Sequence, residues 1–263
     1  MVDSAAFFRL KPSGDVQFFG TTVGMPQDAH GTLCAGMALA RRDNGSAGCG
    51  VAPEARLLPI ACGEAEISSQ VMLARAIAYA TNPRIESGDA LTPADVISCS
   101  LGSTPSKLES VLQAALNDAF NKGRDMLGIP MFWAVDNEQV DLALDEVANS
   151  ILVTAVGRSD KQDRRGPCAS GDHLAFLAPG QGVFSLLPDD TVGVASGTSL
   201  AAPVAAGIGA LVISLDRTLL AREVVDILKR SCDRPTSAHG NLPDAQHGFG
   251  RVNAEKAVNL ASP

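Results

Sequence analysis

The sequence predicts an α/β fold with a largely parallel central sheet. Short apolar runs of strand length alternate along the chain with segments whose apolar residues recur at helical spacing. Hydrophobic residues make up 46% of the chain and charged residues 19%, which is the composition of a globular protein rather than a disordered one. The 263 residues contain no internal repeat and no clear linker, so residues 1–263 are expected to form one compact domain.

Several short apolar runs are interpreted as strands. The last two of them are expected to pair as a hairpin across Asp189-Asp190. In chain order the runs are residues 57–62, 96–100, 129–135, 151–156, 174–178, 183–187 and 192–195.

Helices are predicted where apolar residues recur at helical spacing. Ser106 and Glu109 match an S-x-x-E capping box, and Gly123 is interpreted as the stop of that helix. Residues 199–215 are uncharged and apolar, but they fall just short of a membrane span and include Pro203, which favours a buried core helix. The predicted helices cover residues 33–40, 69–80, 106–122, about 199–215 and 222–230.

Charge and the start of the chain limit the partners. The net charge is −8 and the chain has no cluster of Lys and Arg, which argues against a nucleic-acid partner and is consistent with a soluble surface. The opening Met1-Val2-Asp3 lacks a basic start and an apolar run, so no signal peptide is expected here, and the compartment is left open.

Most of the cysteines lie among apolar neighbours and are interpreted as buried thiols. No two of the six form a C-x-x-C pair, which argues against a zinc site, and their spacing leaves any disulfide pairing open. They are Cys34, Cys49, Cys62, Cys99, Cys168 and Cys232.

Ser199 is the candidate nucleophile. It follows Gly197-Thr198 and opens an apolar helix, where unpaired N–H groups and the helix dipole favour a developing negative charge. This placement suits a hydroxyl whose substrate becomes an oxyanion. The competing interpretation is that Ser199 is only the N-cap of the helix.

His30 and Asn137 are candidate partners. His30, in His30-Gly31-Thr32, precedes a small-residue helix, where an imidazole can face a cleft and exchange protons. Asn137 follows a strand-like run, where its amide can donate a hydrogen bond to an oxyanion. The other three histidines, His173, His239 and His247, are interpreted as loop residues.

Taken together, these segments resemble the subtilisin-like serine peptidases (subtilases), in the family's order and over almost the whole chain. The Gly-Thr-Ser-x-Ala-Ala-Pro block is the most specific of them. The resemblance implies a three-layer sandwich, with helices on both faces of a mostly parallel sheet, and a serine endopeptidase. The matching segments are His30-Gly31-Thr32, Gly50-Val51-Ala52-Pro53, Ser100-Leu101-Gly102, Asn137-Glu138, Leu177-Ala178-Pro179-Gly180, residues 197–203 and residues 248–253.

The resemblance also implies roles for individual residues. Ser199 would be the nucleophile, His30 the general base and then acid, and Asn137, with the N–H of Ser199, the oxyanion hole. A polypeptide substrate would lie along two segments, with Ser100, Leu101, Gly102 and Ser103 in one and Ala134, Val135 and Asp136 in the other.

The match is weakest at the carboxylate that should orient His30. Asp3 is the best candidate, although only two residues precede it, and Asp15 and Asp28 are alternatives. The chain is therefore either a fragment, with a strand and any propeptide or further domains outside it, or a weak or inactive peptide-binding relative. An acidic residue, Asp136, also replaces the family's usual Gly.

Other implications of the resemblance concern cofactors and location. The reaction needs no cofactor, and the resemblance leaves a structural calcium ion open, with residues 43–46 in a suitable loop that alternatively is a plain polar turn. It favours secretion and gives no reason to expect a membrane. An esterase is disfavoured because the chain has no G-x-S-x-G elbow.

Overall fold

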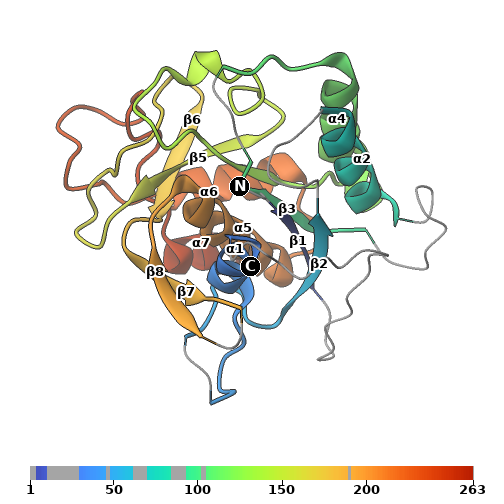
Figure 1. Ribbon diagram of the computed structural model, residues 1–263, viewed down its shortest axis with the longest axis horizontal. Helices are drawn as coiled ribbons and strands as arrows, with labels where there is room; N and C mark the ends of the chain where they lie inside the picture. Colours follow the sequence, from blue (N-terminus) through green and yellow to red (C-terminus); the bar gives the residue numbers. More distant parts are fainter. Residues whose placement is uncertain are drawn as a thin grey trace.

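The fold is that of a computed structural model, which describes residues 4–10, 30–45, 48–61, 70–83, 93–101, 105–188 and 191–262, with residues 4–10 and 61 described by their backbone. A central sheet has the strand order β2-β1-β3-β4-β5-β6, and β7 and β8 form a separate hairpin (Figure 1). The strands are β1 (Ser4–Leu10), β2 (Ala55–Ala61), β3 (Val96–Cys99), β4 (Met131–Ala134), β5 (Thr154–Ser159), β6 (Leu174–Pro179), β7 (Val183–Leu186) and β8 (Val192–Ala195).

Helices pack against both faces of this sheet. They are α1 (His30–Leu39), α2 (Gln70–Thr81), α4 (Ser110–Met126), α5 (Thr198–Leu215), α6 (Ala221–Arg230) and α7 (Ala254–Ala261), with a short 3-10 helix at Leu142–Leu144.

Four neighbouring strands of the sheet, β3 to β6, run parallel to one another. Strand β1 lies between β2 and β3 and is antiparallel to both. The prediction of a mostly parallel sheet is thus confirmed. Since the parallel strands share one direction, their carboxyl ends lie along the same edge of the sheet.

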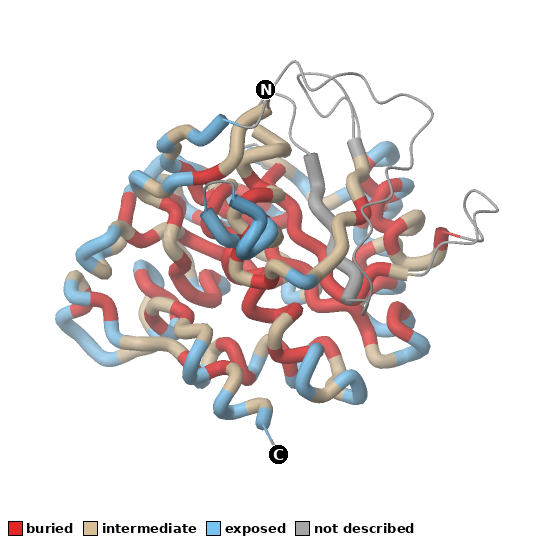
Figure 2. Tube along the Cα trace, turned by 90° about the horizontal axis from the view of Figure 1, so that it is seen from below, coloured by how far each residue is buried: buried red, intermediate tan, exposed pale blue. Residues whose placement is uncertain are grey.

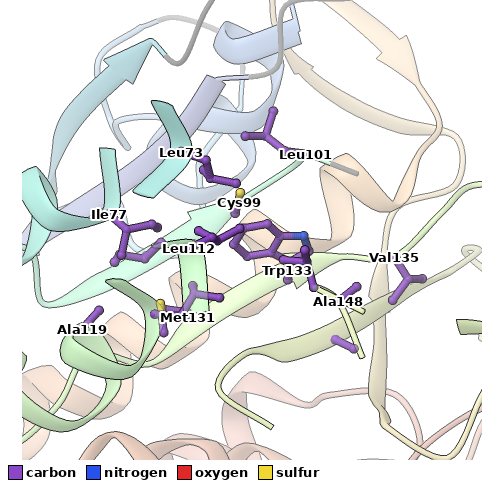
Figure 3. Packing of buried hydrophobic residues seen from close by; sticks show 14 of the residues in the cluster. Leu73, Ile77, Cys99, Leu101, Leu112, Ala119, Met131, Trp133, Val135 and Ala148 are labelled. Atoms are coloured by element: carbon purple, nitrogen blue, oxygen red, sulfur yellow. The ribbon is translucent and has the colours of Figure 1, made fainter. Parts of the chain in front are cut away.

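Both faces of the sheet are buried, as strand β4 shows most clearly. Met131 and Trp133 belong to one apolar cluster, while Phe132 and Ala134 belong to another, because successive side chains of a strand point to opposite faces. The first cluster includes residues of α2 and α4, as Figure 3 shows for Leu73 and its neighbours. The second includes residues of α5, α6 and α7. Buried segments gather in the middle of the molecule (Figure 2).

Helix α5 is the core helix of the second layer. Among the described residues it is the one helix long and apolar enough to cross a membrane, yet 78% of that stretch is buried inside the protein. It packs against β3, β4, β5 and β6. The interpretation of this stretch as a buried core helix is therefore confirmed, and its amino end is placed by the sheet beneath it.

The predicted capping box of α4 is wrong. The helix begins at Ser110, and its N-cap residue Glu109 makes no side-chain cap bond. The hydroxyl of Ser106 instead donates to Oδ1 of Asp145 at 2.7 Å. Asp145 is buried, so its carboxylate must be satisfied by hydrogen bonds within the protein, and this requirement outweighs a local cap. The backbone leaves helical geometry at Gly123, where a stop was expected.

Other boundaries differ by a few residues, and three elements were not predicted, namely β1, α7 and the short 3-10 helix. Strand β5 begins at Thr154 rather than at Ile151, because residues 151–153 form a turn in which Ile151 is exposed. Helix α7 was missed although Ala254, Ala257, Val258 and Ala261 recur at helical spacing, and β1 was missed although it contains an apolar run. Helix α7 is capped by Asn253, whose side chain accepts the N–H of Lys256.

Arg124 is buried where α4 meets the loop before α6. It is 8% exposed, and its guanidinium donates to the carbonyl oxygens of Gly128 at 3.2 Å, Leu219 at 3.0 Å and Arg217 at 3.0 Å. It also lies 3.7 Å from Oδ1 of the buried Asp95. One side chain therefore donates hydrogen bonds to the backbone carbonyls of two separate segments.

We expect Arg124→Ala to destabilise the fold by roughly 2–4 kcal/mol, because it leaves three backbone carbonyls without this donor and removes one of the two guanidinium groups beside the buried Asp95. The matched control is Lys122→Ala, which removes an exposed ion pair with Asp118 and should cost about 0.3–0.5 kcal/mol. Urea unfolding measures both. Equal losses in the two variants would contradict the role given to Arg124.

Candidate active site

Three segments that are distant in the sequence meet at the amino end of α5. The thiol of Cys34, on α1, lies 3.9 Å from both ring nitrogens of His30 and donates to the carbonyl oxygen of Ser199 at 3.1 Å. The amide oxygen of Asn137, which follows β4, accepts the backbone N–H of Thr198 at 2.9 Å. His30, Asn137 and Ser199 are thus brought into one neighbourhood.

Ser199 lies in the first turn of α5 and is half-buried. The N-cap residue is Gly197, so the interpretation of Ser199 as the N-cap is wrong. Gly197 donates its N–H to the carbonyl of Gly180 at 2.8 Å. A Cβ atom at Gly180 would lie 2.7 Å from the oxygen of Gly197, so only glycine allows the chain after β6 to approach α5 this closely.

The orientation of the Asn137 amide is fixed by its neighbours. A backbone N–H can only donate, so the atom that accepts the N–H of Thr198 must be the amide oxygen. The hydroxyl of Thr198 is 3.3 Å from the same oxygen and donates to the carbonyl of Val135 at 2.6 Å. The Nδ2 group of Asn137, an exposed residue, is left as a donor beside the first turn of α5.

His30 is the first residue of α1 rather than the residue before it, and it is half-buried. Helix α1 is held against β7, since the hydroxyl of Ser185 donates to the carbonyl of Leu33 at 2.6 Å. A Cβ atom at Gly36 would lie 2.5 Å from that hydroxyl oxygen. The close packing of α1 on β7 therefore requires a glycine at position 36 and fixes the helix that carries His30.

The residues expected to line the substrate face the protein interior through their side chains. Ser100 is buried and donates its hydroxyl to the carbonyl of Ser199 at 2.7 Å. Leu101, Ala134 and Val135 are buried apolar residues. Any contact of these residues with a ligand would therefore be made by the backbone.

Asp136 is the half-buried residue of that second segment. Its backbone oxygen accepts the N–H of Ala169 at 2.9 Å, and its carboxylate accepts the N–H of Glu138 at 2.9 Å. The acidic group is thus engaged in the turn that carries Asn137. Gly102 and Ser103, and the three candidate carboxylates Asp3, Asp15 and Asp28, lie outside the described residues.

A second arrangement of Ser, His and Asp was missed by the sequence analysis. Nδ1 of His247 lies 3.0 Å from both carboxylate oxygens of Asp244, and Nε2 lies 3.0 Å from the hydroxyl oxygen of Ser237. Ser237 also accepts the N–H of Arg165 at 3.0 Å. His247 is 5% exposed, so it is a buried hydrogen-bonding residue and not simply part of a loop. The three-residue spacing of Asp244 and His247 was the available signal.

This second arrangement lacks the surroundings of the first. Ser237 is not in a helix, whereas Ser199 lies in the first turn of a long one. Its hydroxyl already serves a backbone N–H and an imidazole. These hydrogen bonds join the segment 231–250 to the loop that contains Arg165, which is a structural role.

No metal centre is formed by the part of the chain that the structure describes, where no three His, Cys, Asp or Glu side chains gather to hold an ion. The segment for which a calcium loop was left open is described at Asp43, Asn44 and Gly45, which form an exposed turn with φ angles of 55° at Asp43 and 72° at Gly45. Ser46 lies outside the described residues.

Comparison with known proteins supports this fold. The family model for the subtilases, Peptidase S8, matches residues 20–250. The chain belongs to the subtilase family. It is 32% identical to a calcium-dependent protease of Nostoc sp. over 90% of this chain and 40% of that protein. It is 31% identical to thermitase of Thermoactinomyces vulgaris over 88% of this chain and 75% of thermitase.

Solved structures show the same fold. A protease of Pseudoalteromonas arctica matches with a TM-score of 0.71 and 28% identity, covering 89% of this chain and 71% of that one. The prenylagaramide maturation protease PagA, at 21% identity, supports the fold alone, with a TM-score of 0.72 over 95% of this chain and 87% of its own. The chain spans less than half the length of the calcium-dependent protease that it matches.

The Asp244–His247 pair makes stability depend on pH. Burial alone would raise the pKa of Asp244, but the N–H groups of His247 and Gln246 lower it below its usual value. A carboxylate with a depressed pKa stabilises the fold above its unfolded pKa of about 3.9, and this contribution is lost as the pH falls through the lower folded pKa.

We therefore expect Asp244→Asn to be less stable than wild type at pH 7, with the difference shrinking below about pH 4. Urea unfolding between pH 3 and pH 7 measures the difference. Asp226→Asn, on the exposed side of α6, serves as the control and should show little change at pH 7. A difference between Asp244→Asn and wild type that stays constant with pH would contradict the assignment.

Proposed function

We propose that the chain is a peptidase domain that hydrolyses internal peptide bonds through an acyl-enzyme on Ser199. The supporting observation is the meeting of His30, Asn137 and the first turn of α5, linked through Cys34 and Thr198. Family membership supports the same reaction, since several relatives of this chain are named proteases or serine proteinases. The proposal concerns this domain, because the chain covers part of its longer relatives.

In this reaction the hydroxyl oxygen of Ser199 attacks the carbonyl carbon of the peptide bond while His30 takes the hydroxyl proton. The tetrahedral intermediate breaks its C–N bond, and His30 returns the proton to the leaving amine. Water then attacks the acyl group with His30 again as the base, which releases the acid and restores Ser199.

Asn137 is proposed to stabilise the oxyanion of that intermediate together with the backbone N–H of Ser199. Its amide oxygen is held by Thr198, so Nδ2 is oriented before substrate arrives. Preorganised donors of this kind lower the barrier because they need no rearrangement as charge develops. The amino end of α5 adds the favourable field of the helix dipole.

The substrate is proposed to be an extended polypeptide that lies beside the two segments 100–103 and 134–136. Because the side chains of Ser100, Leu101, Ala134 and Val135 point into the protein, affinity would come from main-chain hydrogen bonds. A propeptide or further domains outside this chain would be additional partners. Relatives named cell wall-associated and extracellular proteases favour secretion, and one named calcium-dependent favours a structural calcium ion.

We expect Ser199→Ala to abolish both casein hydrolysis and labelling by a fluorophosphonate probe. Asn137→Ala should lower kcat by about 10²- to 10³-fold, a range measured on the relative subtilisin, because one oxyanion donor is lost. Ser237→Ala is the matched control, since it removes the other serine that contacts a histidine, and it should be labelled like wild type.

Three outcomes decide this test. Retained labelling in Ser199→Ala would overturn the assignment of the nucleophile. Loss of labelling in Ser237→Ala alone would move the nucleophile to the second arrangement. Peptide binding by the wild type without turnover or labelling would show a binding module rather than a peptidase.

Asp3 is proposed to orient His30 and to stabilise its protonated form. We expect Asp3→Asn to lower kcat by about 10⁴-fold, because the imidazole would be held in the wrong tautomer. Asp15→Asn and Asp28→Asn should stay within a few-fold of wild type. Steady-state kinetics on one peptide substrate compares the three variants, and a large loss at Asp15 or Asp28 instead would reassign the carboxylate.

A further inference from the structure

The carbonyl of Ser199 lacks its usual partner in the helix. In an α-helix each carbonyl accepts the N–H of the residue four positions later, and for Ser199 that residue is Pro203, which has no N–H. The proline ring also crowds the carbonyl four residues before it and tilts that carbonyl away from the helix axis. The nucleophile candidate therefore carries a carbonyl that must find a donor elsewhere.

Two buried side chains from different elements supply that donor. The hydroxyl of Ser100, directly after β3, donates to the Ser199 oxygen at 2.7 Å, and the thiol of Cys34, on α1, donates to it at 3.1 Å. Ser100 is 4% exposed and Cys34 is 1% exposed, so water does not compete for either bond. A carbonyl oxygen has two lone pairs, and both are occupied here.

Cys34 also touches the imidazole. It lies one helical turn after His30, and its sulfur is 3.9 Å from both ring nitrogens. The single thiol hydrogen is directed to Ser199, so the sulfur presents its lone pairs, as a weak acceptor, to the side of His30. The thiol is thus in contact with the proposed base and with the backbone of the proposed nucleophile.

From this geometry we infer that Cys34 and Ser100 are positioning residues for the reaction, acting on the carbonyl that Pro203 leaves without a helical donor. The inference rests on the proposed function of Ser199 and His30. Cys34 fixes α1 against α5 at the point where the imidazole and the hydroxyl must meet, and Ser100 fixes the same carbonyl to the end of β3. Ser100 contacts the backbone of Ser199, and Cys34 contacts that backbone and the imidazole, so each acts through a proposed catalytic residue and not on the peptide bond itself.

Such positioning affects the rate more than substrate binding. A shift of about 1 Å between reacting groups can cost roughly 100-fold in rate, while the peptide still lies in the same cleft. We expect Cys34→Ala and Ser100→Ala each to lower kcat by about 10-fold with KM nearly unchanged. Cys34→Ser keeps a donor at this position and should recover most of the rate.

The matched control is Cys232→Ala. Its thiol also donates to a backbone carbonyl, that of Leu228 at 3.3 Å, but it lies at the end of α6. Steady-state kinetics on a peptide substrate and the rate of Ser199 labelling by a fluorophosphonate are measured for every variant, with melting temperatures. Cys232→Ala should keep the wild-type kcat, and the labelling rate should fall in Cys34→Ala and Ser100→Ala.

Pro203→Ala tests the origin of the arrangement. It restores an N–H that competes for the Ser199 carbonyl, so it should slow labelling on its own. In the double variant with Cys34→Ala the two losses should combine to less than their product, because both act on the same oxygen. Fully multiplicative losses would overturn the part assigned to Pro203.

The remaining outcomes separate this inference from the proposed function. An active wild type whose Cys34→Ala and Ser100→Ala variants keep its kcat would overturn the positioning role and leave the peptidase intact. An equal loss of kcat in Cys232→Ala would show a general effect of losing a thiol and would also overturn it. A wild type with neither turnover nor labelling would overturn the proposed function and this inference together.

Discussion

The burial of α5 against the sheet is the constraint on which the rest of the structure depends. Strands β3 to β6 alternate apolar side chains toward both faces, so each face requires a helical layer. Helix α5 covers the second face along most of its length, and its small residues allow close contact with the strands. Its amino end therefore lies where β4 ends, next to the turn that carries Asn137. The site follows from this packing.

Much of the fold could be predicted because the signals are local. Apolar runs such as residues 96–100 and 174–178 gave strands within one residue of their observed bounds. The capping box at Ser106 failed for a reason that lies outside its own segment, namely the demand of the buried Asp145. A local pattern shows which hydrogen bonds a segment can form, and a buried charge elsewhere in the fold determines which of them it forms.

The site was predicted unevenly for the same reason. The surroundings of Ser199 could be predicted because a small-residue helix with a preceding Gly-Thr has a specific physical meaning. The contacts of Ser100 and Cys34 with Ser199 join residues 99 and 165 positions apart, so no local sequence pattern indicates them. The second Ser–His–Asp arrangement contains the same three residue types without the surroundings of the first. Ser199 differs from Ser237 in that it lies in the first turn of a long helix and has the oriented amide of Asn137 nearby.

The contact between Gly36 and Ser185 has a consequence for divergence within such a family. Because the glycine leaves no room for a side chain, strand β7 packs directly against the helix that carries His30. The outer side of the hairpin, with Phe184 and Val194 exposed, is under no such restriction. Substitutions at the outer positions can therefore change the surface of the hairpin, whereas any side chain at position 36 would push β7 away from the helix.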